Sequence, residues 1–169
     1  GRTVIHLQKS TGGSVIYNGK DITNPTHEEM KALRSEVQII FQDPYSSLNP
    51  RMTVEDTIKE PLLISGRCNK QNVDEETERL MDMVGIAQRI KLCYPHELDG
   101  GRRQRVGIAR ALAMNPKFIV CDEPVSALDV SIQAQILNLL MDLQEEHGLA
   151  YMFITHNMSV VRHISHNIS

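Results

Sequence analysis

Short apolar runs alternate with amphipathic stretches along this chain. Three runs, at residues 37–41, 117–121 and 150–154, are apolar almost throughout, as in parallel strands that are covered on both faces. Between them lie stretches whose apolar residues recur every three or four positions, which is the spacing of amphipathic helices. Because strand, helix and strand follow one another, the pattern predicts an α/β fold with a mostly parallel sheet.

Helix-start and helix-stop residues punctuate the amphipathic stretches. Thr26 with Glu29 forms a capping box, and Thr53 with Asp56 marks a second helix start. Pro61 is expected to end or bend that second helix, because proline removes a hydrogen bond from a helix interior. The predicted helices cover residues 1–9, 26–34, 53–61, 74–84, 101–114 and 131–147, and a last one begins after residue 156.

The helical pattern is unbroken between the first and second apolar strands. A short strand at 14–18, followed by the hairpin pair Asn18-Gly19, lies before that region. From about residue 48 to residue 112 only helices are expected, so this part is read as an insert in the sheet. The prediction is one partial domain over 1–169, with a sheet core at 1–47 and 113–169 and a helical subdomain at 48–112.

Composition adds few constraints. Hydrophobic residues make up 41% and charged residues 23% of the chain, and the net charge of -3 gives no overall attraction to nucleic acid or anionic membrane. No apolar run approaches the ~20 residues that a membrane helix needs. The cysteines are widely spaced, which favours a reducing cytosol. Four arginines, at positions 102, 103, 105 and 110, are expected to lie on a solvated helix face.

Polar side chains follow all three core strands. Gln42 follows the first strand, Asp122 and Glu123 the second, and His156 the third. Ligands of open α/β sheets bind beyond the carboxyl ends of strands, so these side chains are expected to meet at one site. Of the two adjacent acids, one could hold Mg²⁺ and the other could orient or deprotonate a water. Taken alone, the pair is equally consistent with an acidic loop, and His156 with a structural histidine.

Five motifs in a fixed order then identify a family resemblance. The chain resembles the ATP-binding subunits of ABC transporters: LDGGRRQR at 98–105 is similar to the signature, usually LSGGQ, and FIVCDE at 118–123 to the Walker B strand. SALD at 126–129 resembles the D-loop, Gln42 the Q-loop glutamine and His156 the H-loop histidine. The segments FQDPYSSLNPRMTVEDTIKEPL and YPHEL are similar to the oligopeptide and dipeptide uptake branch.

The resemblance implies a P-loop NTPase-type (RecA-like) fold with ATP and Mg²⁺ as cofactors. Asp122 would bind Mg²⁺, Gln42 would sense Mg²⁺ and the attacking water, Glu123 would be the general base and His156 would contact the γ-phosphate. Four residues would face ATP held by a second subunit, and a fifth would support the contact between subunits; these are Asp99, Gly100, Gly101 and Arg102, and Asp129.

Two departures from the family pattern stand out. No GxxxxGK[ST] loop occurs, since the only Gly-Lys pair, at 19–20, is followed by Asp21. Gly1 is therefore expected to follow directly on the Walker A motif, with the strand that leads into it missing. The chain is expected to be an internal fragment that binds ATP weakly and hydrolyses none. In the signature, Asp99 replaces serine and Arg102 replaces glutamine.

The function that the resemblance implies is the ATP-hydrolysing motor of an importer for oligopeptides or dipeptides. Its expected partners are transmembrane permease subunits, a second ATPase subunit and, indirectly, a substrate-binding protein. Its expected place is the cytoplasm, peripheral to the inner face of the plasma membrane. One alternative is an ABC-type ATPase acting on nucleic acid, although the insert is short and shows no sustained heptads. The other is a non-hydrolytic assembly module.

Overall fold

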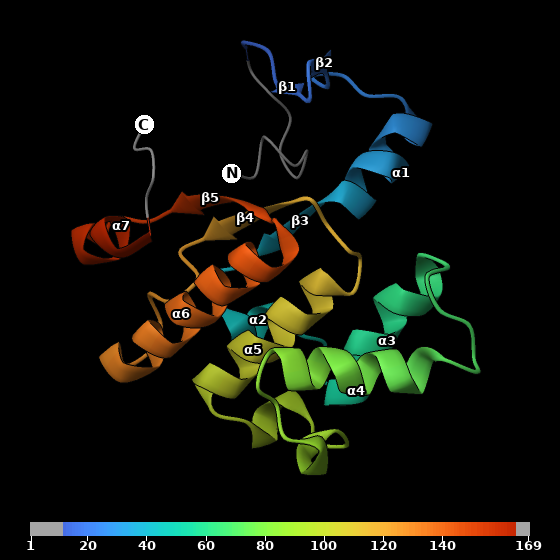
Figure 1. Cartoon of the computed structure of the whole chain (residues 1–169), viewed down its shortest axis with the longest axis vertical. Coiled ribbons are helices and arrows are strands. Elements are labelled where there is room, and N and C mark those ends of the chain that lie inside the picture. Colours follow the sequence, from blue (N-terminus) through green and yellow to red (C-terminus); the bar gives the residue numbers. More distant parts are fainter. Residues whose placement is uncertain (1–11, 165–169) are drawn as a thin grey trace.

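A three-stranded parallel sheet organises the part of the chain that the computed structural model describes, residues 12–164 (Figure 1). The strands are β3 (Val37–Ile40), β4 (Phe118–Asp122) and β5 (Ala150–Ile154), in the order β3-β4-β5. Ile119, Val120 and Cys121 of the central strand are fully buried, as an apolar run between two parallel neighbours predicts. The predicted α/β class and the three predicted core strands are confirmed.

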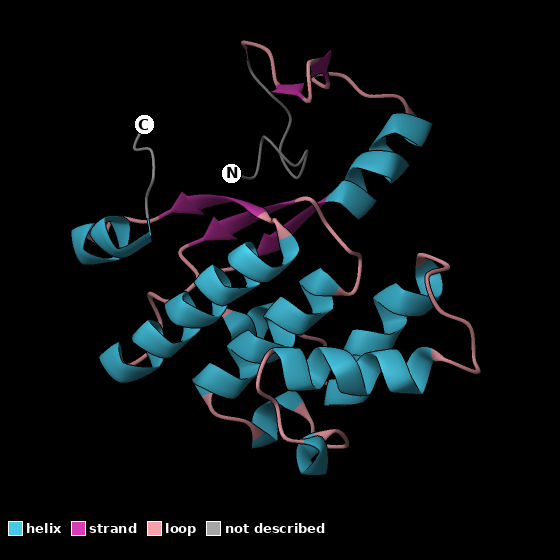
Figure 2. Ribbon diagram, viewed as in Figure 1, coloured by secondary structure: helices cyan, strands magenta, loops and turns pink. Residues whose placement is uncertain are grey.

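Helices pack against the sheet and alternate with its strands along the chain. In Figure 2, α5 (Gly100–Leu112) and α6 (Val130–His147) lie together on one side of the strands. Gly148 ends α6 in a left-handed conformation, with φ of 63°, and its N–H donates to the carbonyl of Gln144. The last described helix is α7 (Met158–Ile164). No helix within residues 12–164 combines the length and the apolar character needed to cross a membrane.

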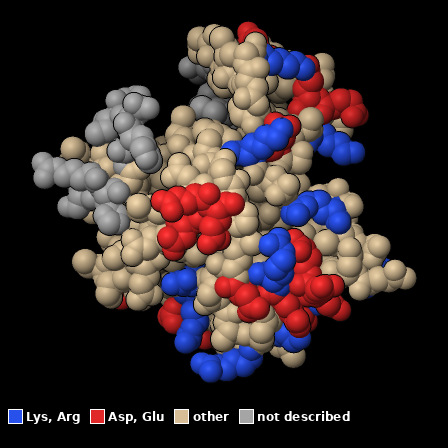
Figure 3. Space-filling view, in the orientation of Figure 1, with Lys and Arg blue, Asp and Glu red and all other residues tan. Residues whose placement is uncertain are grey.

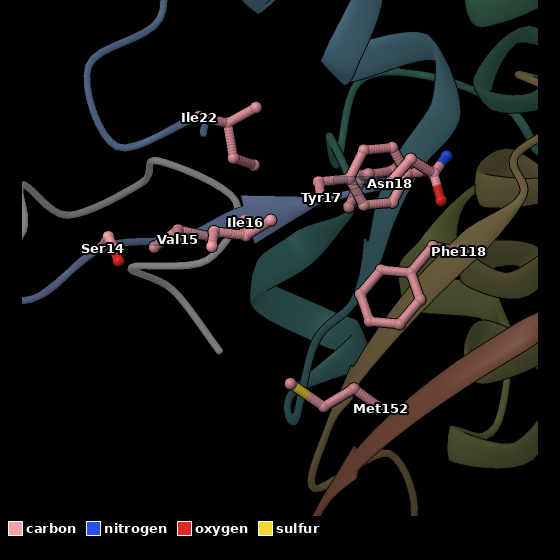
Figure 4. Close-up of a pocket in the computed structure, with 9 residues that line it drawn as sticks. Ser14, Val15, Ile16, Tyr17, Asn18, Ile22, Phe118 and Met152 are labelled. Atoms are coloured by element: carbon pink, nitrogen blue, oxygen red, sulfur yellow. The ribbon is translucent and has the colours of Figure 1, made fainter. Parts of the chain in front are cut away.

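A small hairpin and one helix precede the sheet. The strands β1 (Ile16–Tyr17) and β2 (Lys20–Asp21) pair antiparallel around the predicted Asn18-Gly19 turn. α1 (His27–Glu36) begins at the predicted capping box of Thr26. A pocket of about 380 Å³ separates the hairpin from the sheet, and Figure 4 shows Phe118 and Met152 facing the hairpin residues across it. The predicted helix at 1–9 lies outside the described residues.

The segment between β3 and β4 is helical, as predicted. It contains α2 (Pro44–Ser47), α3 (Val54–Ile64), α4 (Val73–Met83), the short 3₁₀ helices η1 (Gln88–Ile90) and η2 (Pro95–Glu97), and then α5. Its grouping into a separate subdomain stays a prediction.

Lys59 joins α3 to α4 through Asp74 at 2.7 Å, and this hydrogen bond raises the pKa of the lysine above its ordinary value.

Surface charges follow the helices. Figure 3 shows acidic side chains gathered over the C-terminal half of α6, where Asp142, Glu145 and Glu146 are exposed. Over α4 both signs lie side by side in the same view, in keeping with the 2.7 Å pair between Arg79 and Glu76. Exposed pairs of this kind add little to stability, so the buried apolar side chains hold the helices in place.

Two local details of the helical segment differ from a simple view of the sequence. The tripeptide Gln42-Asp43-Pro44 follows the first core strand and is expected to be a loop. Its first two residues are, but Pro44 already begins the one-turn helix α2, because the Asp43 carboxylate accepts from the N–H of Tyr45 and proline occupies the first helical position. Pro61, which was expected to end or bend α3, lies inside it, and the helix continues to Ile64. Ile58 and Leu62 of α3 are fully buried, and this packing outweighs the hydrogen bond that proline cannot make.

The expectation of a solvated arginine face is also wrong for three of the four arginines. Arg103 donates to the carbonyl of Pro95 at 2.6 Å, Arg105 to that of Val84 at 2.7 Å and Arg110 to that of Ser47 at 2.7 Å. Only Arg102 of the four is exposed. Carbonyls at helix ends and in loops have no helical partner, so guanidinium groups placed next to them become half-buried donors.

Candidate active site

The residues that follow the three strands meet at one carboxylate. Gln42 donates from Nε2 to Oε2 of Glu123 at 2.8 Å, and Nδ1 of His156 lies 2.8 Å from Oε1 of the same residue. The strands are parallel and in register, with Val37, Phe118 and Ala150 side by side. Their carboxyl ends therefore open on the same edge. The predicted meeting of three strand ends is confirmed as geometry, whereas the roles of these residues stay predictions.

Glu123 adopts a backbone conformation that is rare for its residue type. Its φ is +48°, in the left-handed region that glycine prefers. Its N–H donates to the carbonyl of Ile154 at 2.8 Å, and its own carbonyl accepts from N and Oγ of Ser126 at 3.3 and 3.2 Å. A left-handed residue with a side chain costs roughly 1–2 kcal/mol. These hydrogen bonds hold it there, which aims the carboxylate between Gln42 and His156.

The contacts distinguish the two adjacent acids chemically. Glu123 has one donor at each carboxylate oxygen and a side chain that is 22% exposed, whereas His156 is 78% exposed. A carboxylate only accepts hydrogen bonds, so the imidazole proton that meets Oε1 is on Nδ1. Asp122 is the last residue of β4 and is half-buried. The Glu123 carboxylate is thus held by two hydrogen bonds at the edge of the sheet, and Asp122 ends the strand beside it.

A second group of predicted site residues lies at the start of α5. Asp99 caps this helix, its Oδ1 accepting from the N–H of Arg102 at 2.7 Å. Its other oxygen lies 3.4 Å from Nη1 of Arg102, and the two side chains are 60% and 52% exposed. Helix capping and ion pairing are both present, so the two uncommon signature residues contact each other.

The two glycines of this group allow α5 to lie directly against the start of α6. A Cβ on Gly100 would lie 3.0 Å from Cδ2 of Leu128, and one on Gly101 would lie 2.8 Å from Cγ2 of Ile132. Asp129, between those two neighbours in the chain, is the exposed N-cap residue of α6. Asp99, Arg102 and Asp129 therefore belong to one surface formed by the starts of two helices.

We expect Gly101→Ala to destabilise the fold and Gly107→Ala, in the same helix, to stabilise it slightly. A Cβ at 101 would overlap the branched side chain of Ile132, and overpacking of this kind costs roughly 1–3 kcal/mol. Nothing lies within 4 Å of a Cβ at 107, where alanine gains about 0.5–1 kcal/mol over glycine. Urea unfolding of both variants measures the difference. Equal stabilities would contradict the close packing of α5 on α6.

Some contacts at this site have no counterpart in the sequence predictions. The bonds from Ser126 to the carbonyl of Glu123, and the position of the Arg103 guanidinium 4.8 Å from the ring centre of Tyr45, were not foreseen. The pair Asp43-Pro44 was a usable sign of a helix start at α2. The spacing of Arg103 and Arg110 was also informative: the two residues are seven positions apart, which is two helical turns, so they lie on the same face of one helix.

Comparison with known proteins identifies the family of this chain. Residues 2–126 match the ABC transporter family. The chain belongs to the ABC transporter family. Among curated members, it is 50% identical over 169 residues to the oligopeptide transport ATP-binding protein AppF of Bacillus subtilis, covering 99% of this chain and 51% of AppF. It is 49% identical to the glutathione import ATP-binding protein GsiA of Escherichia coli K12, covering 100% of this chain and 27% of GsiA.

Solved structures agree on the fold of this ABC transporter family member. A dimeric, post-hydrolysis structure of the ATP-binding cassette MJ0796 bound to ADP and Pi matches with a TM-score of 0.81 at 30% identity, over 95% of this chain and 70% of that one. CbiO1 of Clostridium perfringens matches with a TM-score of 0.81 at 26% identity, over 95% and 62%. The predicted P-loop NTPase-type fold is confirmed. The chain spans about half the length of AppF and about a quarter of GsiA.

Proposed function

We propose that this chain is part of the ATP-hydrolysing subunit of an ABC importer for small peptides. The observation that carries the proposal is the carboxylate of Glu123, held between Gln42 and His156 at the ends of three parallel strands. A general base must be fixed in direction and must reach the proton that it accepts; the two hydrogen bonds supply the first property for Glu123. His156, on the exposed side of the carboxylate, is then placed to contact the phosphate that is transferred.

The donor atoms fit Mg²⁺ bound together with a nucleotide. Within residues 12–164 no group of three or more His, Cys, Asp and Glu side chains could hold a metal by itself. Mg²⁺ usually takes one or two protein carboxylates and completes its shell with phosphate oxygens and water. Asp122 and the amide oxygen of Gln42 would hold it, and bound Mg²⁺ would offset the charge that develops on the phosphates.

The substrate and partners follow from the relatives. AppF is named for oligopeptide transport and GsiA for glutathione import; glutathione is itself a tripeptide, so small peptides are the shared chemistry. The MJ0796 cassette is dimeric, and we assign this subunit a second ATPase subunit, with the start of α5 facing ATP bound by that partner. Permease subunits, and through them a substrate-binding protein, complete the transporter, which places the subunit at the inner face of the plasma membrane.

Neither alternative function has a specific observation in its favour. The described helices between β3 and β4 are short, α3 and α4 having 11 residues each, and do not suit the long coiled coils of ABC ATPases that act on DNA. An assembly module without hydrolysis has no need for a strained glutamate fixed by two polar partners.

The test is peptide uptake by cells that express a full-length protein carrying this chain, together with its permease. We expect accumulation of a labelled di- or oligopeptide, with ATP hydrolysis by the purified complex that requires Mg²⁺. Glutathione in a parallel assay separates the two relatives' substrates. A correctly assembled complex that hydrolyses no ATP would contradict the proposed enzyme, whereas hydrolysis without peptide uptake would contradict only the substrate.

A further inference from the structure

The short helix α2 connects the two groups of site residues. It begins two residues after Gln42 and comprises only four residues. A single turn is not stable in isolation, so contacts with the rest of the protein must fix it. Those contacts come from α5, the helix whose first turn carries Asp99 and Arg102, and α2 packs against it.

Two arginines on one face of α5 hold the two ends of α2. The Arg103 guanidinium lies 4.8 Å from the centre of the Tyr45 ring, at the beginning of α2. Arg110, two turns further along α5, donates from Nη1 to the carbonyl of Ser47, the last residue of α2, at 2.7 Å. Burial lowers the pKa of Arg110 below its ordinary value. A partly buried cation is costly without partners. The Ser47 carbonyl of α2 is one partner of Arg110, and the negative charge of Glu60 is another.

Arg103 is also fixed to the start of α5 itself. Its N–H donates to the carbonyl of Asp99 at 3.0 Å, and its Nε donates to the carbonyl of Pro95 at 2.6 Å. The guanidinium over Tyr45 therefore belongs to the same rigid turn as the Asp99–Arg102 pair. A displacement of that turn would displace Tyr45, and with it Gln42, three residues earlier.

We propose that Arg103 and Tyr45 are positioning residues that hold the Gln42 amide against Glu123 and link this contact to the start of α5. The effect on catalysis rests on the proposed function. The hydrogen bond between Gln42 and Glu123 does not, because it is present without ATP. Through these contacts, a displacement of the start of α5 would reach the Gln42 amide and loosen its hydrogen bond to Oε2 of Glu123.

The test follows the side-chain amide of Gln42 by NMR in a nucleotide-free, full-length protein carrying this chain. The signal is assigned by its loss in Gln42→Ala, and Glu123→Ala gives its position when the hydrogen bond is absent. We expect Tyr45→Leu and Arg103→Met to move the signal toward that position. Tyr45→Phe keeps the ring face under the guanidinium and should leave it unchanged.

Arg105→Met is the matched control. Arg105 also donates to a backbone carbonyl, that of Val84 next to α4, but it does not hold α2. Its loss should leave the Gln42 signal in place. An unmoved signal in folded Arg103→Met and Tyr45→Leu, or an equal movement in Arg105→Met, would overturn the proposal, whether or not the protein hydrolyses ATP.

Turnover adds an independent readout. In the assembled transporter, Tyr45→Leu should lower kcat by roughly tenfold with little change in the KM for ATP, because Gln42 is no longer held in place. Tyr45→Phe should keep kcat within about twofold of the unaltered protein. In a Gln42→Ala background, Tyr45→Leu should have no further effect. Additive effects of the two changes would overturn the proposed link between Tyr45 and Gln42. Absence of ATP hydrolysis in the unaltered transporter would instead contradict the proposed function, and the NMR result alone would then decide whether Arg103 and Tyr45 position Gln42.

Discussion

Glu123→Gln is expected to stop ATP turnover by the full-length protein while preserving ATP binding. The amide keeps the shape of the side chain but cannot accept a proton from water, and loss of a general base typically costs ~10²–10⁴-fold in rate. The substitution also replaces one of the two carboxylate oxygens by an NH2 donor, which then faces Nε2 of Gln42 or Nδ1 of His156. Phosphate release and the binding of a fluorescent ATP analogue measure the two effects separately.

Glu145→Gln on the exposed face of α6 is the control for loss of a negative charge. It should hydrolyse ATP at the normal rate. His156→Ala should also lose most turnover, because it removes the second partner of the Glu123 carboxylate. If Glu123→Gln hydrolysed ATP normally, the base would have to be another group.

Arg102→Gln is the second change with a large expected effect. Asp99 takes the place of a serine that would donate to phosphate, and a carboxylate brings a like charge instead. Two unit charges ~4 Å apart at an effective dielectric constant of ~20 interact by about 4 kcal/mol. We propose that Arg102, whose Nη1 lies 3.4 Å from Oδ2 of Asp99, offsets this repulsion and offers its further donors to the phosphate. Removing it should cripple ATPase activity in the assembled pair of subunits.

The second substitution separates this explanation from simple helix capping. Asp99→Ser retains an N-cap side chain for α5 and removes the carboxylate, so adding it to Arg102→Gln should restore much of the activity. Thermal unfolding of the single and double variants shows that the start of α5 is intact. Strictly additive effects on the ATPase rate would mean that Asp99 and Arg102 act independently.

Local signals in the sequence were sufficient to predict the strands of the sheet and the polar residues that follow them. Apolar runs located β3, β4 and β5, and the rule that ligands bind beyond strand ends brought Gln42, Glu123 and His156 together before their contacts were known. These features depend on residue pattern and on strand direction. The residue pattern is a property of short segments, and the helices that connect the strands imply that the strands run parallel, so both could be predicted from one sequence.

The partners of the arginines could not be read in the same way. Arg103, Arg105 and Arg110 resemble residues of a solvated face until the carbonyls of Pro95, Val84 and Ser47 are placed beside them. Those carbonyls come from loops and helix ends up to 63 residues away in the chain. Whether Pro61 ends its helix could not be decided from the sequence for a related reason, since the burial of Ile58 and Leu62 depends on which helices pack against α3.

The left-handed backbone of Glu123 has a consequence for selection experiments on this protein. Glycine adopts a φ of +48° without the steric cost that a glutamate side chain incurs. A screen that rewards only expression or thermal tolerance would therefore enrich glycine at position 123, and would discard the carboxylate in doing so. At this position, a gain in melting temperature would be a warning of lost turnover, so libraries built to improve the protein should keep residue 123 fixed.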